Sequence, residues 1–265
     1  MALESGDIAV EHRGAIAIVT LQRPDKLNAI TPAMGRGYAA ALRQCGADPD
    51  VRVIVVRGAG AGFCSGADLA MLAQGPDALE GFLADQRRDS PTLALDLPVP
   101  VVTVVHGAAA GLGFVIALAS DMCFAGPGAR FIPAFPRLGL IAEYSIAWLL
   151  LQRVGSLRTH DILLSGREID ATTAADWGMV DGPHDDPLTA ALAWAEMVAQ
   201  SCSPTSLATI KSQISRAATQ TREQALQESL DLMTESFRGA DLPEALLARV
   251  EGRPPAFPPR SPGLR

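Results

Sequence analysis

The chain has 265 residues, of which 48% are hydrophobic and 19% are charged, so it is long enough to bury a large globular core. Its net charge of −7, without a Lys/Arg run longer than two residues, argues against a general nucleic-acid binder. The longest apolar run, around residues 112–119, is too short to span a bilayer, and we expect no membrane association.

The N-terminal third alternates strands with helices. The apolar pattern over residues 8–21 predicts a β-hairpin, and Thr31-Pro32 predicts the start of a helix. A β-branched run at 51–56 predicts a buried strand. This strand leads into the small-residue stretch 58–72, and the polar segment 74–90 is expected to be helical and to lie partly over a site.

The next part of the chain repeats the order of strand, small-residue turn and helix. A strand is predicted at 98–105, a turn at 106–113 and a helix at about 114–120, followed by strands at 121–125 and 129–135. The remaining segments are predicted to be helices, at about 144–154, 157–165, 171–177, 188–201, 204–218 and 221–238. This order predicts an α/β core followed by a helical C-terminal end.

The two strand–turn–helix units, at 58–72 and 106–120, invite a joint interpretation. If their turns face each other, each can donate a backbone N–H to one carbonyl oxygen, and such a pair stabilises an enolate or a tetrahedral oxyanion. The alternative is that the glycines only let each helix pack closely on its strand. Spacing alone leaves both interpretations open.

The first turn also fits a second chemistry. Gly62 to Gly66 matches the nucleophile-elbow pattern G-x-C-x-G, in which Cys64 would be the nucleophile and His160 or His184 its partner. A buried, inert cysteine is the alternative. The four cysteines lack a C-x-x-C pair and no secretory signal is apparent, which predicts free thiols in a reducing cytoplasm. The four histidines have no metal-ligand spacing, so no metal is expected.

Several segments, in the expected order, resemble the signatures of the enoyl-CoA hydratase/isomerase (crotonase) superfamily. Gly-Phe-Cys-Ser-Gly-Ala-Asp-Leu at 62–69 is similar to its first signature, and residues 106–121 are similar to its second. Residues 23–29 resemble its CoA-binding N-terminal loop, residues 171–180 its next landmark, and residues 237–257 its C-terminal end. The resemblance therefore covers nearly the whole chain.

The resemblance implies a fold, an assembly and a ligand. The implied fold is α/β, a crotonase-type spiral of β-β-α repeats over residues 1–195, with a helical C-terminal region at 196–265. In the implied assembly, this region builds homotrimers, which in the family commonly pair into hexamers. The implied ligand is an acyl-CoA thioester, so coenzyme A is part of the substrate and no separate cofactor is expected.

The resemblance also implies site residues. The backbone N–H groups of Ala67 and Leu112 would form an oxyanion hole between the two turns. The residues expected to contact coenzyme A are Arg23, Lys26, Leu27, Ala29, Ala67, Asp68, Leu69 and Lys211. Among these, the basic side chains are candidates for phosphate contacts. The expected acyl pocket comprises Met71, Val115 and Phe135.

The choice of reaction depends on the acidic residues. The family's hydratases use two glutamates, whose positions fall on Val115 and Phe135 here, and an apolar side chain cannot act as a general base. Glu143 remains, in a pattern most similar to that of Δ3,Δ2-enoyl-CoA isomerases, where one carboxylate can shift a double bond through a thioester enolate. Three alternatives stay open: a hydratase that uses Glu143 and an ordered water, a non-catalytic acyl-CoA binder, and a Glu143 that only charges the N-terminus of the following helix.

Overall fold

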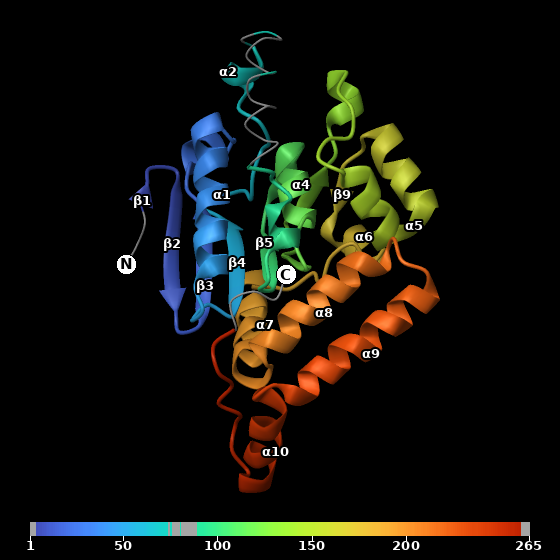
Figure 1. The fold of residues 1–265 in the computed structure, drawn as a ribbon. Coiled ribbons are helices and arrows are strands. Elements are labelled where there is room, and N and C mark those ends of the chain that lie inside the picture. The colour runs from blue at the N-terminus through green and yellow to red at the C-terminus, as the bar shows by residue number, and fades with distance from the viewer. Residues whose placement is uncertain (1–3, 74, 76–79, 81–88, 261–265) are drawn as a thin grey trace.

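A computed structural model of the chain describes residues 4–73, 75, 80 and 89–260 (Figure 1). The helix expected at 74–90 lies largely outside these residues. The larger sheet has the strand order β1-β2-β3-β4-β5-β7 and the smaller sheet the order β6-β8-β9. The strands are β1 (Glu4–Ser5), β2 (Ile8–Arg13), β3 (Ile16–Leu21), β4 (Val53–Gly58), β5 (Val101–Val105), β6 (Ala108–Ala110), β7 (Met122–Ala125), β8 (Arg130–Ile132) and β9 (Ile169–Asp170).

The larger sheet begins as a hairpin and continues as parallel strands. β2 and β3 form the predicted antiparallel hairpin, with Ile8 opposite Leu21. β3, β4, β5 and β7 are parallel neighbours, and β3 and β5 are buried along their whole length. Strands covered on both faces need no polar side, which explains why their sequences are nearly continuous runs of Val and Ile.

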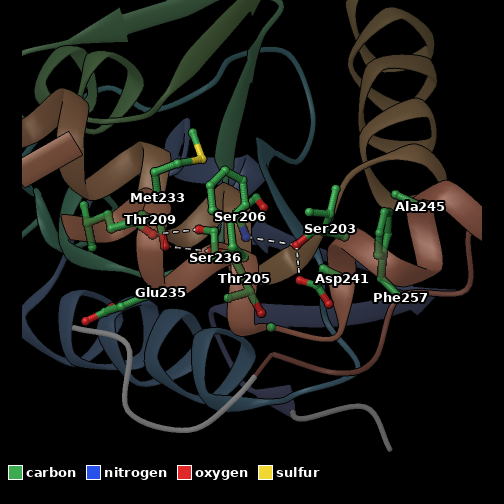
Figure 2. Close-up of a pocket in the computed structure, with 14 residues that line it drawn as sticks. Ser203, Thr205, Ser206, Thr209, Met233, Glu235, Ser236, Asp241, Ala245 and Phe257 are labelled. Atoms are coloured by element: carbon green, nitrogen blue, oxygen red, sulfur yellow. Dashed lines mark hydrogen bonds between the residues drawn. The ribbon is translucent and has the colours of Figure 1, made fainter. Parts of the chain in front are cut away.

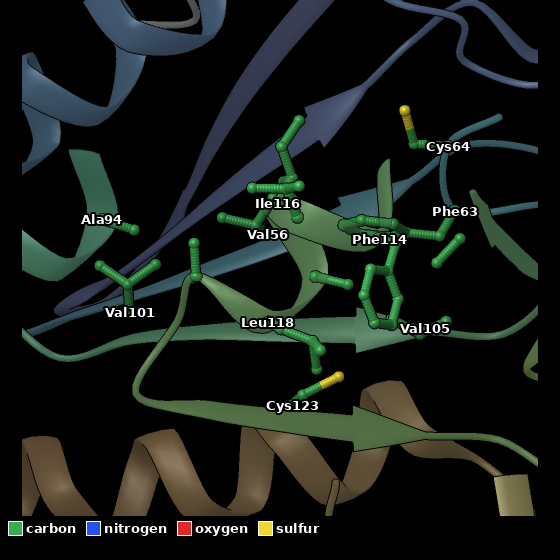
Figure 3. Close-up of a cluster of buried hydrophobic side chains, with 14 of the residues drawn as sticks. Val56, Phe63, Cys64, Ala94, Val101, Val105, Phe114, Ile116, Leu118 and Cys123 are labelled. Atoms are coloured by element: carbon green, nitrogen blue, oxygen red, sulfur yellow. The ribbon is translucent and has the colours of Figure 1, made fainter. Parts of the chain in front are cut away.

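Helices cover both faces of this sheet. The helices of the described residues are α1 (Pro32–Ala47), α2 (Leu69–Leu72), α4 (Leu112–Leu118), α5 (Ile146–Ser165), α6 (Ala171–Asp176), α7 (Pro187–Ser201), α8 (Pro204–Ala217), α9 (Arg222–Arg238) and α10 (Asp241–Glu251). α1 packs on β2, β3 and β4, whereas α7 packs on β4, β5 and β7. α4 adds Phe114, Ile116 and Leu118 to the main hydrophobic core (Figure 3). None of the described helices is long and apolar enough to cross a membrane.

The last two helices lie outside the core. α9 and α10 extend away from the sheet (Figure 1), and α9 has no buried residue. α7, in contrast, buries Ala191, Leu192, Ala195 and Val198 against the sheet. The boundary predicted between residues 195 and 196 falls inside α7.

Two predicted elements differ from the structure near Glu143. The strand expected at 129–135 ends at Ile132, and Phe135 instead begins the short 3-10 helix η3 (Phe135–Leu138). The helix expected to begin at residue 144 begins at Ile146, because Tyr144 and Ser145 have left-handed backbone angles, with φ of +48° and +61°. These two non-glycine residues place a sharp bend between Glu143 and α5.

Candidate active site

The two small-residue turns interlock. The N–H groups of Phe63 and Cys64 donate to the Ala108 carbonyl, and the Ala110 N–H donates to the Cys64 carbonyl over 2.9 Å. Gly113 lies so close to the first turn that an added Cβ would overlap the Cys64 carbonyl and approach the Cys64 Cβ to 2.7 Å. The turns therefore face each other, as one of the two interpretations of the sequence required, and glycine at 113 is a packing requirement.

Ala67 in the first turn and Leu112 in the second each have a backbone N–H without a partner in the described part of the chain. Ile30 pairs with the first turn by donating to the Gly66 carbonyl over 2.7 Å and accepting from the Asp68 N–H over 2.9 Å. This pairing leaves the Ala67 N–H on the opposite side, without an acceptor. Leu112 is the first residue of α4, where the N–H has no intrahelical acceptor. Both residues predicted to form the oxyanion hole thus present an unused donor.

A cavity of about 390 Å³ brings these donors together with Glu143. Its wall is formed by the two turns and by the segment that leads into α5: Ser65, Gly66, Ala67, Leu69, Ala110, Gly111, Leu112, Ala134, Phe135, Leu138, Leu140, Ile141, Ala142, Glu143 and Tyr144. The lining is almost entirely apolar, and Glu143 is the only carboxylic acid among the described residues that form it. A larger cavity of about 520 Å³, between α8, α9 and α10, contains none of the predicted site residues (Figure 2).

The Glu143 carboxylate is partly buried and unpaired. Among the described residues it has no hydrogen-bond or ion-pair partner, and burial raises its pKa above the ordinary glutamate value. It does not cap the next helix, because α5 begins three residues later and its N-cap, Ser145, makes no side-chain cap. A carboxylate with a raised pKa in an apolar cavity can accept a proton and return it.

The residues expected to contact coenzyme A lie mostly around the first turn. Arg23 donates to the Asp68 carboxylate over 3.1 Å and to the Ala29 carbonyl, so it ties the N-terminal loop to this turn. Hydrogen bonds from the Ala70 N–H and from Arg23 lower the pKa of Asp68. Lys26 and Leu27 are exposed on the same side, next to the first turn, and Leu69 is exposed at the cavity.

Lys211 lies elsewhere, and its expected contact with coenzyme A is corrected. Its ammonium group donates to the Ala94 and Val99 carbonyls and to Asp121, over 2.7, 3.0 and 2.7 Å. Three partners use all three donors of a lysine, and the side chain is only 11% exposed. Lys211 therefore attaches α8 to the segments that precede β5 and β7, and it has no donor left for a phosphate.

The expected acyl pocket is also revised. Phe135 lines the cavity, but Val115 and Met71 do not, because both side chains turn into the hydrophobic core. The wall missed by sequence reasoning is the apolar run that contains Leu138, Leu140 and Ile141. A signal for it was present, since this run stands directly before Glu143 and matches neither a strand nor a helix pattern.

The cysteine-hydrolase interpretation is wrong on the geometry. Cys64 is fully buried, its thiol donates to the Asn28 carbonyl over 3.2 Å, and burial raises its pKa to about 12. His160 contacts Ser156, and His184 contacts Asp181, so neither histidine is a base for this thiol. A thiol without thiolate character is a poor nucleophile.

Comparisons with known proteins point to one family. The sequence profile described as enoyl-CoA hydratase/isomerase matches residues 11–260. A 1,2-epoxyphenylacetyl-CoA isomerase of Escherichia coli is 33% identical over 247 residues, 91% of this chain and 94% of its own. A probable enoyl-CoA hydratase of Mycobacterium tuberculosis is 39% identical over 186 residues, 67% of this chain and 69% of its own.

Solved structures confirm the predicted fold. The crystal structure of an enoyl-CoA hydratase from Bacillus anthracis superposes with a TM-score of 0.90 at 25% identity, covering 95% of this chain and 99% of that one. An enoyl-CoA hydratase from Polaromonas sp. JS666 gives a TM-score of 0.87 at 28% identity, covering 95% of this chain and all of that one. The spiral of β-β-α repeats with a helical C-terminal region is therefore the fold of this protein.

Proposed function

Because the chain belongs to the enoyl-CoA hydratase/isomerase family, we propose that it shifts the double bond of an enoyl-CoA, with Glu143 as its single general acid and base. The observation that carries this proposal is the content of the cavity. Two unpaired N–H donors, at Ala67 and Leu112, share it with one unpaired carboxylate. The name of the Escherichia coli relative, an isomerase of an acyl-CoA, adds support.

The proposed reaction needs only these groups. Glu143 removes a proton from C2 of a 3-enoyl thioester, and the electrons move onto the thioester oxygen to give a dienolate. The Ala67 and Leu112 N–H groups hold the negative charge on that oxygen. The protonated Glu143 then returns the proton at C4, which leaves the double bond between C2 and C3. Atoms and charge balance without a second acid.

A hydratase is the second candidate, because several relatives carry that name, including the Mycobacterium tuberculosis and Polaromonas proteins. In this case Glu143 would activate a water molecule. The family's two-glutamate mechanism has no acid here at Val115, which is fully buried, or at Phe135. A non-catalytic acyl-CoA binder is the third candidate.

Product analysis separates these candidates. The protein is incubated with 3-hexenoyl-CoA and, separately, with 2-hexenoyl-CoA, and products are followed by chromatography. Isomerisation gives 2-hexenoyl-CoA from the first substrate, whereas a hydratase gives 3-hydroxyhexanoyl-CoA from the second. Binding of both without turnover would leave the binder as the function.

The same proposal extends to coenzyme A and to assembly. We expect the adenine to lie near residues 26–29, with Arg23, Lys26, Leu27, Ala29, Ala67, Asp68 and Leu69 around the coenzyme. The C-terminal helices expose large apolar side chains, including Ile214, Leu230, Phe237 and Val250. Such a surface supports a homotrimer, or a dimer of trimers, which light scattering of the full chain would detect. A cytoplasmic location stays a prediction.

A further inference from the structure

Asn28 is the only asparagine among the 265 residues, and its side chain is completely buried. We propose that Asn28 is a positioning residue, which holds the first turn in the shape that aims the Ala67 N–H at the thioester oxygen. This inference rests on the proposed function, because it concerns the same oxyanion hole. Asn28 does not line the cavity and would act through the turn.

The side-chain amide binds the segment that leads into the turn. Its Nδ2 lies 2.9 Å from the Ala59 carbonyl, 3.0 Å from that of Gly62 and 3.1 Å from that of Phe63. Its Oδ1 accepts from the Arg23 N–H over 2.9 Å. The amide therefore uses both its donor and its acceptor inside the protein, where an unpaired polar group would be costly.

The backbone on either side of Asn28 binds the rest of the turn. The Leu27 carbonyl accepts from the Ser65 N–H over 2.9 Å, and Ile30 makes its two bonds to Gly66 and Asp68. This pairing also sets the direction of the Ala67 N–H. Ile30 pairs with one edge of the extended backbone around Ala67, so the Ala67 N–H points away from Ile30, toward the other edge. Residues 27–30 thus hold residues 65–68 in place through backbone hydrogen bonds. The Asn28 side chain binds the start of the same turn to residues 27–30.

Asparagine suits this position for two reasons. Its backbone is left-handed, with φ of +56°, and asparagine tolerates this conformation better than other residues with a Cβ. Its amide also offers donors to three carbonyl oxygens, whereas the carboxylate of an aspartate would repel them. Glycine keeps the backbone conformation but removes every side-chain bond, so Asn28→Gly separates the two requirements.

The test combines kinetics with a spectroscopic signature of the oxyanion hole. Hexanoyl-CoA labelled with ¹³C at the thioester carbonyl is bound to the wild type and to Asn28→Gly, and the carbonyl infrared band is recorded. We expect the wild type to lower the band frequency relative to water, and Asn28→Gly to lose most of this shift. We also expect kcat to fall roughly tenfold to a hundredfold, with a smaller change in KM, because the donor is displaced and not removed.

Ser203→Ala is the matched control. Ser203 is also buried and also bonds a distant residue, Asp241, but it lies in the second cavity, among α8, α9 and α10 (Figure 2). This variant should keep the carbonyl band and kcat. If Asn28→Gly also keeps both, the inference is overturned. If the wild type itself does not lower the carbonyl band, the proposed oxyanion hole fails, and this result is distinct from failure of the role of Asn28.

A measurement on the wild type covers the case in which Asn28→Gly does not fold. Labelling with ¹⁵N-asparagine gives one side-chain amide pair in an NMR spectrum, because the chain has one asparagine. We expect its protons to exchange slowly with solvent, and to exchange more slowly still when hexanoyl-CoA occupies the oxyanion hole. Rapid exchange, or exchange unaffected by the thioester, would contradict the inference.

Discussion

The two glycine turns differ from the segment 134–145 in how each is held against the cavity they share. In the turns, backbone hydrogen bonds, the Asn28 amide and close contacts at Gly113 leave little freedom. In the segment, the Glu143 carboxylate has no hydrogen-bond partner among the described residues, and Ile141 is 81% exposed. In the proposed mechanism, the turns supply fixed backbone donors, whereas the choice of reaction depends on one side chain in the segment 134–145.

The largest expected effect comes from substituting a glycine in each region, which tests whether the turns are held more tightly than the segment. Gly113→Ala places a Cβ against the Cys64 carbonyl, and we expect a loss of roughly 3 kcal/mol in the free energy of unfolding together with loss of activity. Gly139→Ala meets open space and adds only a left-handed backbone cost of about 1 kcal/mol. Urea unfolding of both variants measures the difference. Equal losses would show that the turns are no more tightly held than the segment.

Glu143→Gln should affect activity more than binding. We expect kcat to fall by roughly 10²- to 10⁴-fold, because the general base is lost, while acyl-CoA affinity changes little. Glu168→Gln is the control, since Glu168 pairs with Arg130 at the surface. Normal turnover by Glu143→Gln would contradict the assigned role.

The pH dependence of the wild type follows from the burial of Glu143. Burial raises its pKa, so activity that needs the carboxylate should fall as the pH drops through a value above the ordinary glutamate pKa. The contribution of Glu143 to stability changes with pH in the opposite direction to activity. A raised folded-state pKa favours folding below the unfolded-state pKa, and this contribution disappears as the pH rises through the folded-state value. Glu143→Gln should therefore be more stable than the wild type at neutral pH and lose this advantage in acid.

Much of the structure of the two glycine turns could be predicted from sequence, because the sequence patterns that indicate it are local. Strand, small-residue turn and helix stand in order at 58–72 and again at 106–120, and the structure places both turns together. The sequence could not show which side of α4 faces the cavity, because every residue of this short helix is buried. Its sequence therefore has no polar face to show that Leu112 meets the cavity while Val115 does not.

Long-range contacts explain the other differences. Lys211 is attached to Ala94, Val99 and Asp121, whose positions are 117, 112 and 90 residues away, and no pattern near Lys211 reveals them. The role of Asn28 was also hidden, because its acceptors lie 31 to 35 residues further along the chain. The left-handed pair at Tyr144 and Ser145 contradicts the local helix pattern, which placed the start of α5 two residues early.

A smaller effect tests whether the exposed segment binds substrate. Ile141→Ala should change the free energy of unfolding by less than about 0.5 kcal/mol, because the side chain is largely exposed. It should lower kcat/KM for hexenoyl-CoA by up to roughly tenfold if this side chain covers the acyl group. Leu157→Ala, equally exposed on α5 but outside the cavity, should leave kcat/KM unchanged. Identical kinetics for the two variants would remove Ile141 from the acyl pocket.

The smallest effect concerns the bend after Glu143. Ser145 is left-handed and makes no side-chain cap, so Ser145→Gly relieves a backbone cost without losing a hydrogen bond. We expect a gain of roughly 0.5 kcal/mol in the free energy of unfolding, after allowing for the greater flexibility of unfolded glycine. A higher melting temperature would support this account, and a lower one would show that Ser145 stabilises the bend in another way.

Transfer of a labelled proton tests the central claim most directly. 3-Hexenoyl-CoA carrying two deuterium atoms at C2 is converted in ordinary water, and the position of deuterium in the product is read by mass spectrometry and NMR. A single carboxylate in an apolar cavity should carry part of the deuterium from C2 to C4 of 2-hexenoyl-CoA, and Glu143→Gln should slow the conversion by roughly 10²- to 10⁴-fold. A product without deuterium at C4, or conversion only of 2-hexenoyl-CoA to the hydroxyacyl thioester, would contradict the account.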